Sequence, residues 1–234
     1  MLKNVYKILI VFVIGMFGGI FASQILWPYF VEDYLFYQYR PDRIPVYPPE
    51  IKEIYIQENV ALKDAIERAE KAVIRVKSET AAGRVLEGSG LILTSDGLII
   101  TLAELVPAGW EFSFYVNGQR VPYQVLKRDL AKNLALVKLE KTNLTSVGFA
   151  RTERLKLGER VFLVGALPAG FAANEGIITS FNSDFVETNI FEKSTLAGSP
   201  LFDIEAKFLG LNIVGKDGRV TAVPISVIRD FSGL

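Results

Sequence analysis

The chain of 234 residues contains no cysteine and no histidine. The absence of cysteine excludes disulfide bonds, thiolate nucleophiles and cysteine metal sites. The absence of histidine removes the usual general base for a serine nucleophile and the commonest metal ligand, which disfavours hydrolases and metalloenzymes. We therefore expect no metal ion and no cofactor.

The chain also lacks an excess of charge of either sign. It has 26 Lys and Arg residues against 26 Asp and Glu residues. Without a basic surplus there is little to attract a phosphate backbone, so we expect no nucleic-acid partner. With 50% hydrophobic residues and 22% charged residues, the composition is that of a chain that can bury a core.

One long stretch near the N-terminus has no charged residue. It runs from Ile8 to Trp27, about the length that a helix needs to span a bilayer. Lys3 and Lys7 precede it, which favours a cytoplasmic N-terminus and a soluble part that is periplasmic or extracellular. A cleaved signal peptide is the alternative, although the small-residue exit at 21–23 is a poor cleavage site.

Composition divides the chain into three parts. Residues 1–30 form the cytoplasmic N-terminus and the anchor, and 31–58 contain a proline-rich stretch that predicts an extended spacer. In residues 59–234, Asn59 is positioned to cap a helix from 60 to about 71, and short strand patterns follow it. Six strands are expected near 73–77, 88–93, 98–103, 111–116, 121–127 and 134–139. Six more are expected near 160–165, 176–180, 185–188, 200–202, 208–214 and 221–224.

Two sets of six strands favour an all-β class with two antiparallel barrels, at about 72–145 and 157–231, although the spacing also permits a sandwich. Several ordered blocks of sequence resemble the trypsin-like serine proteases of the HtrA/Deg type. They are Gly88-Ser89-Gly90 with Asp96-Gly97, the run 129–138, Leu157-Gly158-Glu159, Gly176 to Ser180, the run 188–201, and Ala222-Val223-Pro224. The resemblance covers nearly all of the soluble part and implies the two-barrel fold.

The resemblance also indicates where the catalytic residues of that family fall in this chain. The histidine position is Glu104, the aspartate position is Asn133, and the serine position is Ala197. The glycine two residues before the serine is replaced by Thr195. Ala197 has no nucleophilic atom, and a β-branched residue at 195 is unfavourable for an oxyanion hole built from the N–H groups of Ala197 and Thr195.

These replacements predict a protein without catalytic residues, a pseudoprotease. A relocated nucleophile is the alternative, with Ser199 or Ser194 in the same loop and Lys193 as the base. The acidic residues Glu104, Asp129 and Glu192 have no metal-ligand spacing, and a solvated surface explains them.

The function expected is that of a membrane-anchored, inactive domain that binds a peptide or protein partner outside the cytoplasm, by strand addition in the cleft between the barrels. A structural or assembly role is the alternative, as a homo-oligomer such as a trimer or in a complex with active relatives. Since the sequence ends at Leu234, soon after the last strand, the C-terminal PDZ domain of many relatives is not expected.

Overall fold

The computed structural model describes residues 2–26, 57–151 and 155–234. The chain divides into two compact units, Met1–Tyr55 and Ile56–Leu234. Residues 31–56 of the proposed spacer lie outside the described residues, whereas its last two residues, Gln57 and Glu58, are helical.

The N-terminal unit contains one long apolar helix. Helix α1 (Leu2–Phe21) continues into a short π-helical turn η1 (Ala22–Leu26). The segment Lys3–Leu26 contains an 18-residue stretch with a mean hydropathy of 2.3, so it is long and apolar enough to cross a membrane or to act as a signal sequence.

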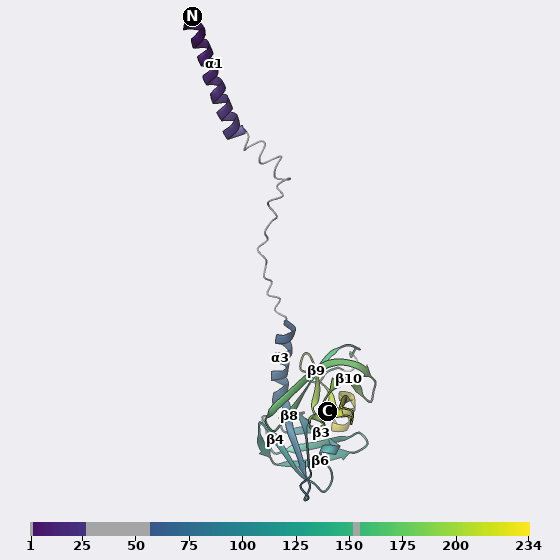
Figure 1. The fold of residues 1–234 in the computed structure, drawn as a ribbon. Coiled ribbons are helices and arrows are strands. Elements are labelled where there is room, and N and C mark those ends of the chain that lie inside the picture. The colour runs from purple at the N-terminus through teal and green to yellow at the C-terminus, as the bar shows by residue number, and fades with distance from the viewer. Residues whose placement is uncertain (1, 27–56, 152–154) are drawn as a thin grey trace. The chain divides into compact units, whose positions relative to one another are not determined.

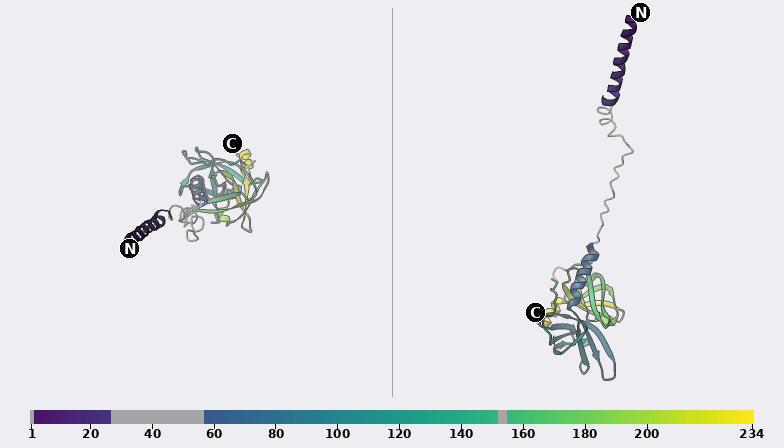
Figure 2. Two further views of the ribbon diagram at one scale, coloured as in Figure 1. Left: turned by 90° about the horizontal axis from the view of Figure 1, so that it is seen from above. Right: turned by 90° about the vertical axis from the view of Figure 1, so that its left-hand side faces the viewer.

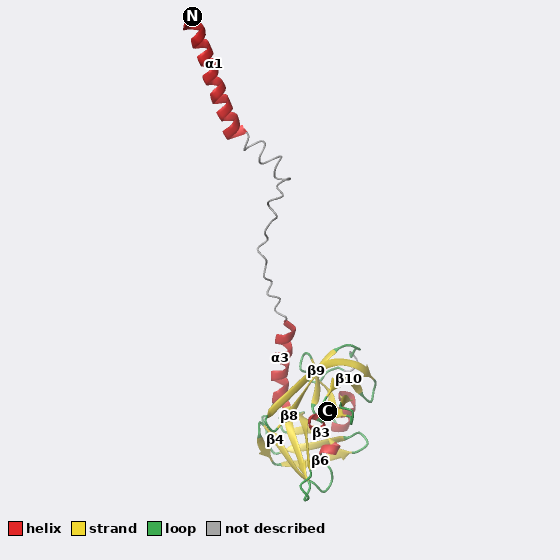
Figure 3. Cartoon of the chain, viewed as in Figure 1, coloured by secondary structure: helices red, strands yellow, loops and turns green. Residues whose placement is uncertain are grey.

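The second unit opens with helix α3 (Gln57–Ala69) and a 3₁₀ turn η3 (Glu70–Ala72), followed by strands (Figures 1 and 3). Ala65 and Ala69 are fully buried, so this helix rests one face on the core. The helix begins at Gln57, so Asn59 lies in its first turn. The prediction that Asn59 caps a helix from residue 60 is therefore wrong. Gln57 and Glu58 are good helix formers, which extends the helix toward the N-terminus.

The first β-unit is a seven-stranded antiparallel sheet with the order β5-β4-β1-β2-β3-β7-β6. Its strands are β1 (Val73–Glu79), β2 (Val85–Ile92), β3 (Leu98–Leu102), β4 (Glu111–Val116), β5 (Gln119–Val121), β6 (Tyr123–Asp129) and β7 (Leu134–Leu139). A six-stranded barrel was expected here, whereas this unit has seven strands and is a half-barrel rather than a closed one. The seventh arises because Pro122 separates β5 from β6, and proline has no N–H for a sheet ladder. The two edge strands are thus consecutive parts of one bent segment.

The second β-unit is a closed six-stranded barrel with the order β10-β13-β12-β11-β8-β9, as expected. Its strands are β8 (Arg160–Leu167), β9 (Gly170–Phe181), β10 (Val186–Phe191), β11 (Pro200–Asp203), β12 (Phe208–Val214) and β13 (Arg219–Pro224). In Figure 1 and the right view of Figure 2, the teal strands of the sheet and the green to yellow strands of the barrel form two neighbouring lobes.

A C-terminal helix, α4 (Ile225–Ser232), follows the barrel and was not expected from the sequence. Ile225, Ile228 and Phe231 are buried at helical spacing, and Gly233 ends the helix in the left-handed conformation. The core continues through both β-units, and its largest fully buried side chains include Phe114, Phe162, Phe202 and Phe208. This shared core fixes the loops at the junction of the two lobes.

Candidate functional site

The first part of the site is the turn that follows β3. Strand β3 is buried up to Leu102, and the chain then forms a 3₁₀ turn, η4 (Ala103–Leu105), which exposes the side chain of Glu104. The carbonyl oxygen of Leu105 accepts a hydrogen bond from the hydroxyl of the buried Ser78. The carbonyl oxygen of Val106 accepts another from the guanidinium of Arg128. These two bonds hold the backbone directly after Glu104.

Asn133 lies directly against this turn. Its side-chain Oδ1 accepts a hydrogen bond from the backbone N–H of Glu104 at 3.0 Å, and its carbonyl oxygen accepts one from the N–H of Ala103 at 3.1 Å. Asn133 has a φ of 52°, the left-handed conformation that asparagine tolerates well. The structure therefore brings together the residues at the histidine and aspartate positions, with an amide bound to the backbone rather than to an imidazole.

The second part of the site is the loop before β11. Ser194–Leu196 form a 3₁₀ turn, η6, and Ala197 follows it with φ −58° and ψ 142°. The N–H of Leu196 donates to the carbonyl of Lys193 at 2.9 Å, and the N–H of Ala197 donates to the carbonyl of Ser194 at 3.0 Å. The N–H of Ser199 donates to the carbonyl of Leu196 at 3.2 Å. This loop uses its own carbonyls to satisfy its N–H groups.

This arrangement bears directly on the oxyanion hole. Such a hole needs backbone N–H groups that point at the place where a substrate oxygen becomes negatively charged. The N–H of Ala197, one of the two expected donors, is instead bonded to Ser194. Thr195, the residue of the other expected donor, lies inside the 3₁₀ turn.

Leu105 connects the two parts of the site. A Cβ atom on Gly88 or on Gly198 would collide with the Leu105 side chain, so Leu105 packs closely against both glycines. The N–H of Ser89 on β2 donates to the carbonyl of Ala197 at 2.9 Å. Ala197 is only 7% exposed, so its methyl group belongs to the packed core rather than to an open cleft.

Asn212 on β12 supports the loop from the barrel side. Its carbonyl accepts from the N–H of Gly198 at 2.8 Å, and its N–H donates to the carbonyl of Ser199 at 2.9 Å. Its amide Nδ2 also donates to the hydroxyl of Ser199 at 3.2 Å. Both residues are fully buried.

Leu105 and Asn212 were not among the site residues expected from the sequence. An asparagine in an otherwise apolar strand is the one signal that could have drawn attention to Asn212. Ser194 and Lys193, by contrast, are exposed. Within residues 2–26, 57–151 and 155–234 there is no cluster of three acidic side chains suited to a metal ion.

Comparison with known proteins identifies a family, curated relatives and a similar solved structure. A family model described as a trypsin-like peptidase domain matches residues 88–211. A probable periplasmic serine endoprotease, DegP-like, from Halomonas elongata is 28% identical over 160 residues, which cover 61% of this chain and 34% of the relative. A protein of the same description from Rhizobium meliloti is 27% identical over 161 residues, covering 62% and 32%.

The chain therefore spans about a third of the length of these curated relatives. Among solved structures, the HtrA-type protease AlgW with a tripeptide is similar, with a TM-score of 0.66 and 22% identity over 74% of this chain and 62% of that chain. This similarity supports the trypsin-like fold, with its closed barrel and its half-barrel, for residues of the second unit.

Proposed function

Because the chain belongs to the trypsin-like peptidase domain family, with HtrA- and DegP-like relatives, we propose that it is a membrane-anchored, proteolytically inactive member that binds a peptide or protein partner. The observation that carries this proposal is the state of the loop at 194–199. The residue at the serine position of this loop is Ala197, and its N–H donates to the carbonyl of Ser194 in the same loop.

The chemistry of the family needs a nucleophile and a base. A serine hydroxyl becomes reactive when an imidazole takes its proton and a carboxylate orients that imidazole. Ala197 offers no proton to remove, and Asn133 uses its side-chain oxygen for the N–H of Glu104. Glu104 alone has no nucleophile to activate.

A relocated nucleophile is disfavoured by the surroundings of Ser199. This hydroxyl is 0% exposed and is bonded to the amide of Asn212, so it has no access to a substrate. Ser194 is exposed, but its carbonyl accepts the N–H of Ala197 and so closes the place where an oxyanion hole would form.

Partner binding without cleavage is the activity that this fold retains. The similar HtrA-type structure holds a tripeptide, and an extended peptide binds to a sheet edge through main-chain hydrogen bonds that need no catalytic residue. In the described part of this chain, β6 is an edge strand of the seven-stranded sheet, and its Val125 and Leu126 side chains are exposed. These features support a role in peptide recognition.

The proposed location is outside the cytoplasm. Curated relatives are described as periplasmic, and the segment Lys3–Leu26 suits an anchor. Lys3 and Lys7 at the start of the helix favour a cytoplasmic N-terminus.

A structural role is the second candidate, and the packing of the site favours it. Leu105 and Ala197 are buried where the two β-units meet, so the loop at 194–199 packs against both units. In this role the domain would support an assembly, as a homo-oligomer or with active relatives. Cross-linking of the detergent-extracted protein separates the candidates, because a monomer that binds peptides is incompatible with a purely scaffolding role.

The inactivity is tested by labelling the full chain in detergent with a fluorophosphonate, which reacts with activated serines. We expect no labelling of the wild type, of Ala197→Ser, or of the triple variant Glu104→His, Asn133→Asp and Ala197→Ser, because the Ala197 N–H stays bonded within the loop. Labelling of the wild type that Ser199→Ala or Ser194→Ala abolishes would overturn the proposal. An active HtrA-type protease serves as the positive control.

A further inference from the structure

A groove lies between the turn that joins β4 to β5 and the hairpin of β8 and β9. Its volume is about 340 Å³, within the range of ligand pockets. The first β-unit contributes residues of β1, of β4 and of the turn, and the second contributes the hairpin. The groove is therefore built from both β-units.

The backbone around the groove is held in place without a ligand. The N–H of Ala166 in the hairpin donates to the hydroxyl of Ser89 on β2 at 2.9 Å, and both residues are buried. Asn117 and Gly118 close the turn with φ of 51° and 75°, the conformation of a tight two-residue hairpin turn. Binding in a groove that is already formed costs little conformational entropy.

Arg75 is the one charged side chain among the described residues that line the groove. Its guanidinium lies over the ring of Tyr115, 4.1 Å from the ring centroid, and this stacking fixes the plane of the guanidinium. The nearest guanidinium nitrogen is 3.5 Å from the carboxylate oxygen of Glu87, which is longer than a hydrogen-bonded ion pair.

The N–H donors of Arg75 are the second observation. The guanidinium makes no hydrogen bond with any residue that the structure describes, and its nitrogen atoms reach the surface. Arg120 lies opposite Tyr115 in the register of β4 and β5, on the same face of the sheet. Two arginines thus neighbour the ring of Tyr115, against the single acid Glu87, so the charge at this end of the groove favours an anion.

The other walls of the groove are apolar. They are formed by Val73 of β1 and by Leu167, Pro168 and Phe171 of the hairpin, and Phe171 is 45% exposed. A phosphate group would bring about two negative charges to one arginine among apolar side chains. One carboxylate matches one guanidinium both in charge and in its two-pronged geometry.

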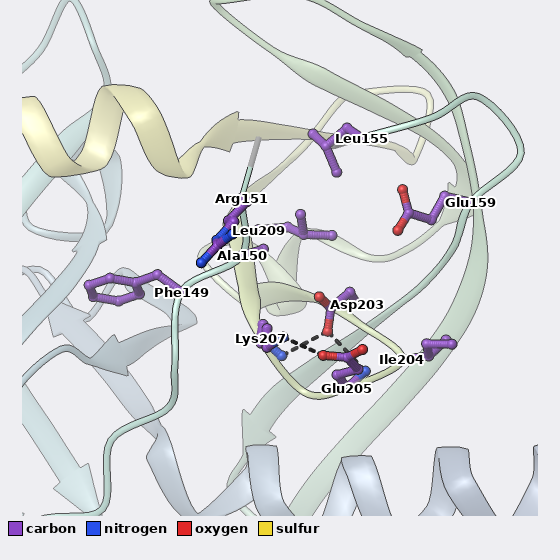
Figure 4. A pocket seen from close by; sticks show the side chains of 10 residues that line it. All are labelled: Phe149, Ala150, Arg151, Leu155, Glu159, Asp203, Ile204, Glu205, Lys207 and Leu209. Carbon is purple, nitrogen blue, oxygen red and sulfur yellow. Dashed lines mark hydrogen bonds and ion pairs between the residues drawn. The ribbon is translucent and has the colours of Figure 1, made fainter. Parts of the chain in front are cut away.

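The hollow beside the hairpin that joins β11 to β12 differs in this respect (Figure 4). Its wall contains the cations of Arg151 and Lys207 together with the carboxylates of Asp203 and Glu205. Glu205 and Lys207 form an ion pair with each other. That hollow therefore shows no preference for a ligand of either charge.

We propose that the groove between the β4–β5 turn and the β8–β9 hairpin binds a glutamate or aspartate side chain of a partner polypeptide. The carboxylate binds the guanidinium of Arg75, and apolar residues beside it in the partner pack against Leu167 and Phe171. The inference rests on the proposed partner binding and adds to it a place and a chemical preference. It does not involve the loop at 194–199.

The test uses the full chain in micelles of an uncharged detergent and isothermal titration calorimetry. The probe is an acetylated, amidated pentapeptide, Gly-Leu-Glu-Leu-Gly, and the matched control peptide has glutamine in place of glutamate. We expect the glutamine peptide to bind at least about tenfold more weakly, since charge-assisted hydrogen bonds are lost. Glutarate, a free carboxylate without flanking apolar groups, is expected to bind more weakly than the glutamate peptide.

Arg75→Gln is the decisive variant, and we expect at least about a tenfold loss of affinity for the glutamate peptide. Arg84→Gln is its matched control. The guanidinium of Arg84 also lies over an aromatic ring, that of Trp110 at 5.9 Å, but Arg84 is exposed and does not line the groove. Thermal unfolding of both variants shows that a loss of affinity does not come from a loss of fold.

Phe171→Ala tests the apolar wall without a change of charge. We expect about fivefold weaker binding of the glutamate peptide, because part of the apolar contact is lost. Phe191→Ala is the control, since Phe191 on β10 is 58% exposed and does not line the groove. Glu87→Gln removes the acid that competes for Arg75, so this variant is expected to bind the glutamate peptide more tightly.

Equal affinity for the two peptides, unchanged affinity in Arg75→Gln, or weaker binding in Glu87→Gln would overturn the inference. Binding of glutarate as tight as that of the peptide would overturn the assignment to a polypeptide. If sedimentation shows that Phe171→Ala dissociates an oligomer of the full chain, the groove is occupied by a second copy and the inference is wrong.

The proposed function is tested separately on the same samples. A wild type that retains unfolded casein intact but does not bind the glutamate peptide would overturn the inference about the groove alone. Mass spectrometry of the peptide after the titration shows whether it has been cleaved, which tests the proposed inactivity.

Discussion

At the scale of single residues, Asn133 stabilises the site through its backbone and its side chain together. It adopts a left-handed conformation at φ 52°, and its Oδ1 accepts the N–H of Glu104 at 3.0 Å. An aspartate at this position would keep the acceptor. The residue at the aspartate position thus stabilises the turn at Glu104 through a hydrogen bond that does not involve an imidazole.

We predict that Asn133→Ala lowers the free energy of unfolding by about 1–3 kcal/mol, because alanine loses the hydrogen bond and is disfavoured at positive φ. Asn143→Ala is the matched control, since Asn143 has a φ of 58° and its side chain makes no hydrogen bond with the described residues. Urea denaturation measures both. Equal losses in the two variants would show that the bond to Glu104 contributes nothing.

Asp203 gives a prediction about pH. Its pKa is raised above the ordinary value of 3.8 in the folded protein by burial, so its ionisation destabilises the fold. The protonated carboxyl group of Asp203 contributes to the free energy of unfolding in full below pH 3.8. This contribution is lost as the pH rises through the folded-state pKa. We therefore expect Asp203→Asn to be more stable than the wild type at pH 7, and the difference to vanish near pH 3 when urea denaturation is repeated there. A less stable variant at pH 7 would contradict this account.

At the scale of elements, the loop at 194–199 is fixed by close approaches of the backbone. Gly198 has a φ of 74°, and a Cβ atom on it would overlap the carbonyl oxygen of Ser89. On Gly88, a Cβ would lie 2.6 Å from the carbonyl oxygen of Ala197. The loop and strand β2 therefore fit together only where these side chains are absent.

We predict that Gly198→Ala destabilises the protein by about 3 kcal/mol or more, because backbone collision adds to the strain of positive φ. Gly109→Ala is the control, since Gly109 has a φ of 80° and open space around it. We expect a loss of about 1–2 kcal/mol there. Thermal unfolding followed by circular dichroism compares the two, and similar losses would argue against close packing at Gly198.

Much of the element order follows from the sequence, because alternating β-branched residues and the turns at Asp96-Gly97, Asn117-Gly118 and Asp217-Gly218 are local signals. The break between β5 and β6 also had a local signal, since Pro122 lies inside the expected strand. Helix α4 had one too, because apolar residues at helical spacing precede Gly233. The start of β9 did not, since Gly170, Ala172 and Ala173 have low strand propensity.

The site was predictable only in part. The order of motifs indicated which residues occupy the catalytic positions, and the structure places Glu104 beside Asn133. The role of Leu105 depends on its packing against Gly198, about 90 residues further along the chain, which no local pattern encodes. The bond from the Ala197 N–H to Ser194 is local, but it depends on the conformation of the loop.

At the scale of the whole molecule, the chain combines a protease-like unit with an N-terminal helix that is long and apolar enough to cross a membrane. The segment Lys3–Leu26 has no charged residue after Lys7. We predict that the full chain stays in the membrane fraction after alkaline carbonate extraction and that a chain starting at Gln57 is soluble. If the expressed full chain instead appears in the soluble fraction, with a mass that lacks about the first 26 residues, the segment is a cleaved signal sequence.

The central claim is binding without cleavage. The most direct measurement incubates the full chain in detergent with unfolded casein and follows complex formation by pull-down and casein integrity by mass spectrometry. The account predicts that casein is retained on the protein and remains intact, in the wild type and in Ser199→Ala alike. Cleavage of casein by the wild type at a rate that Ser199→Ala abolishes would contradict it.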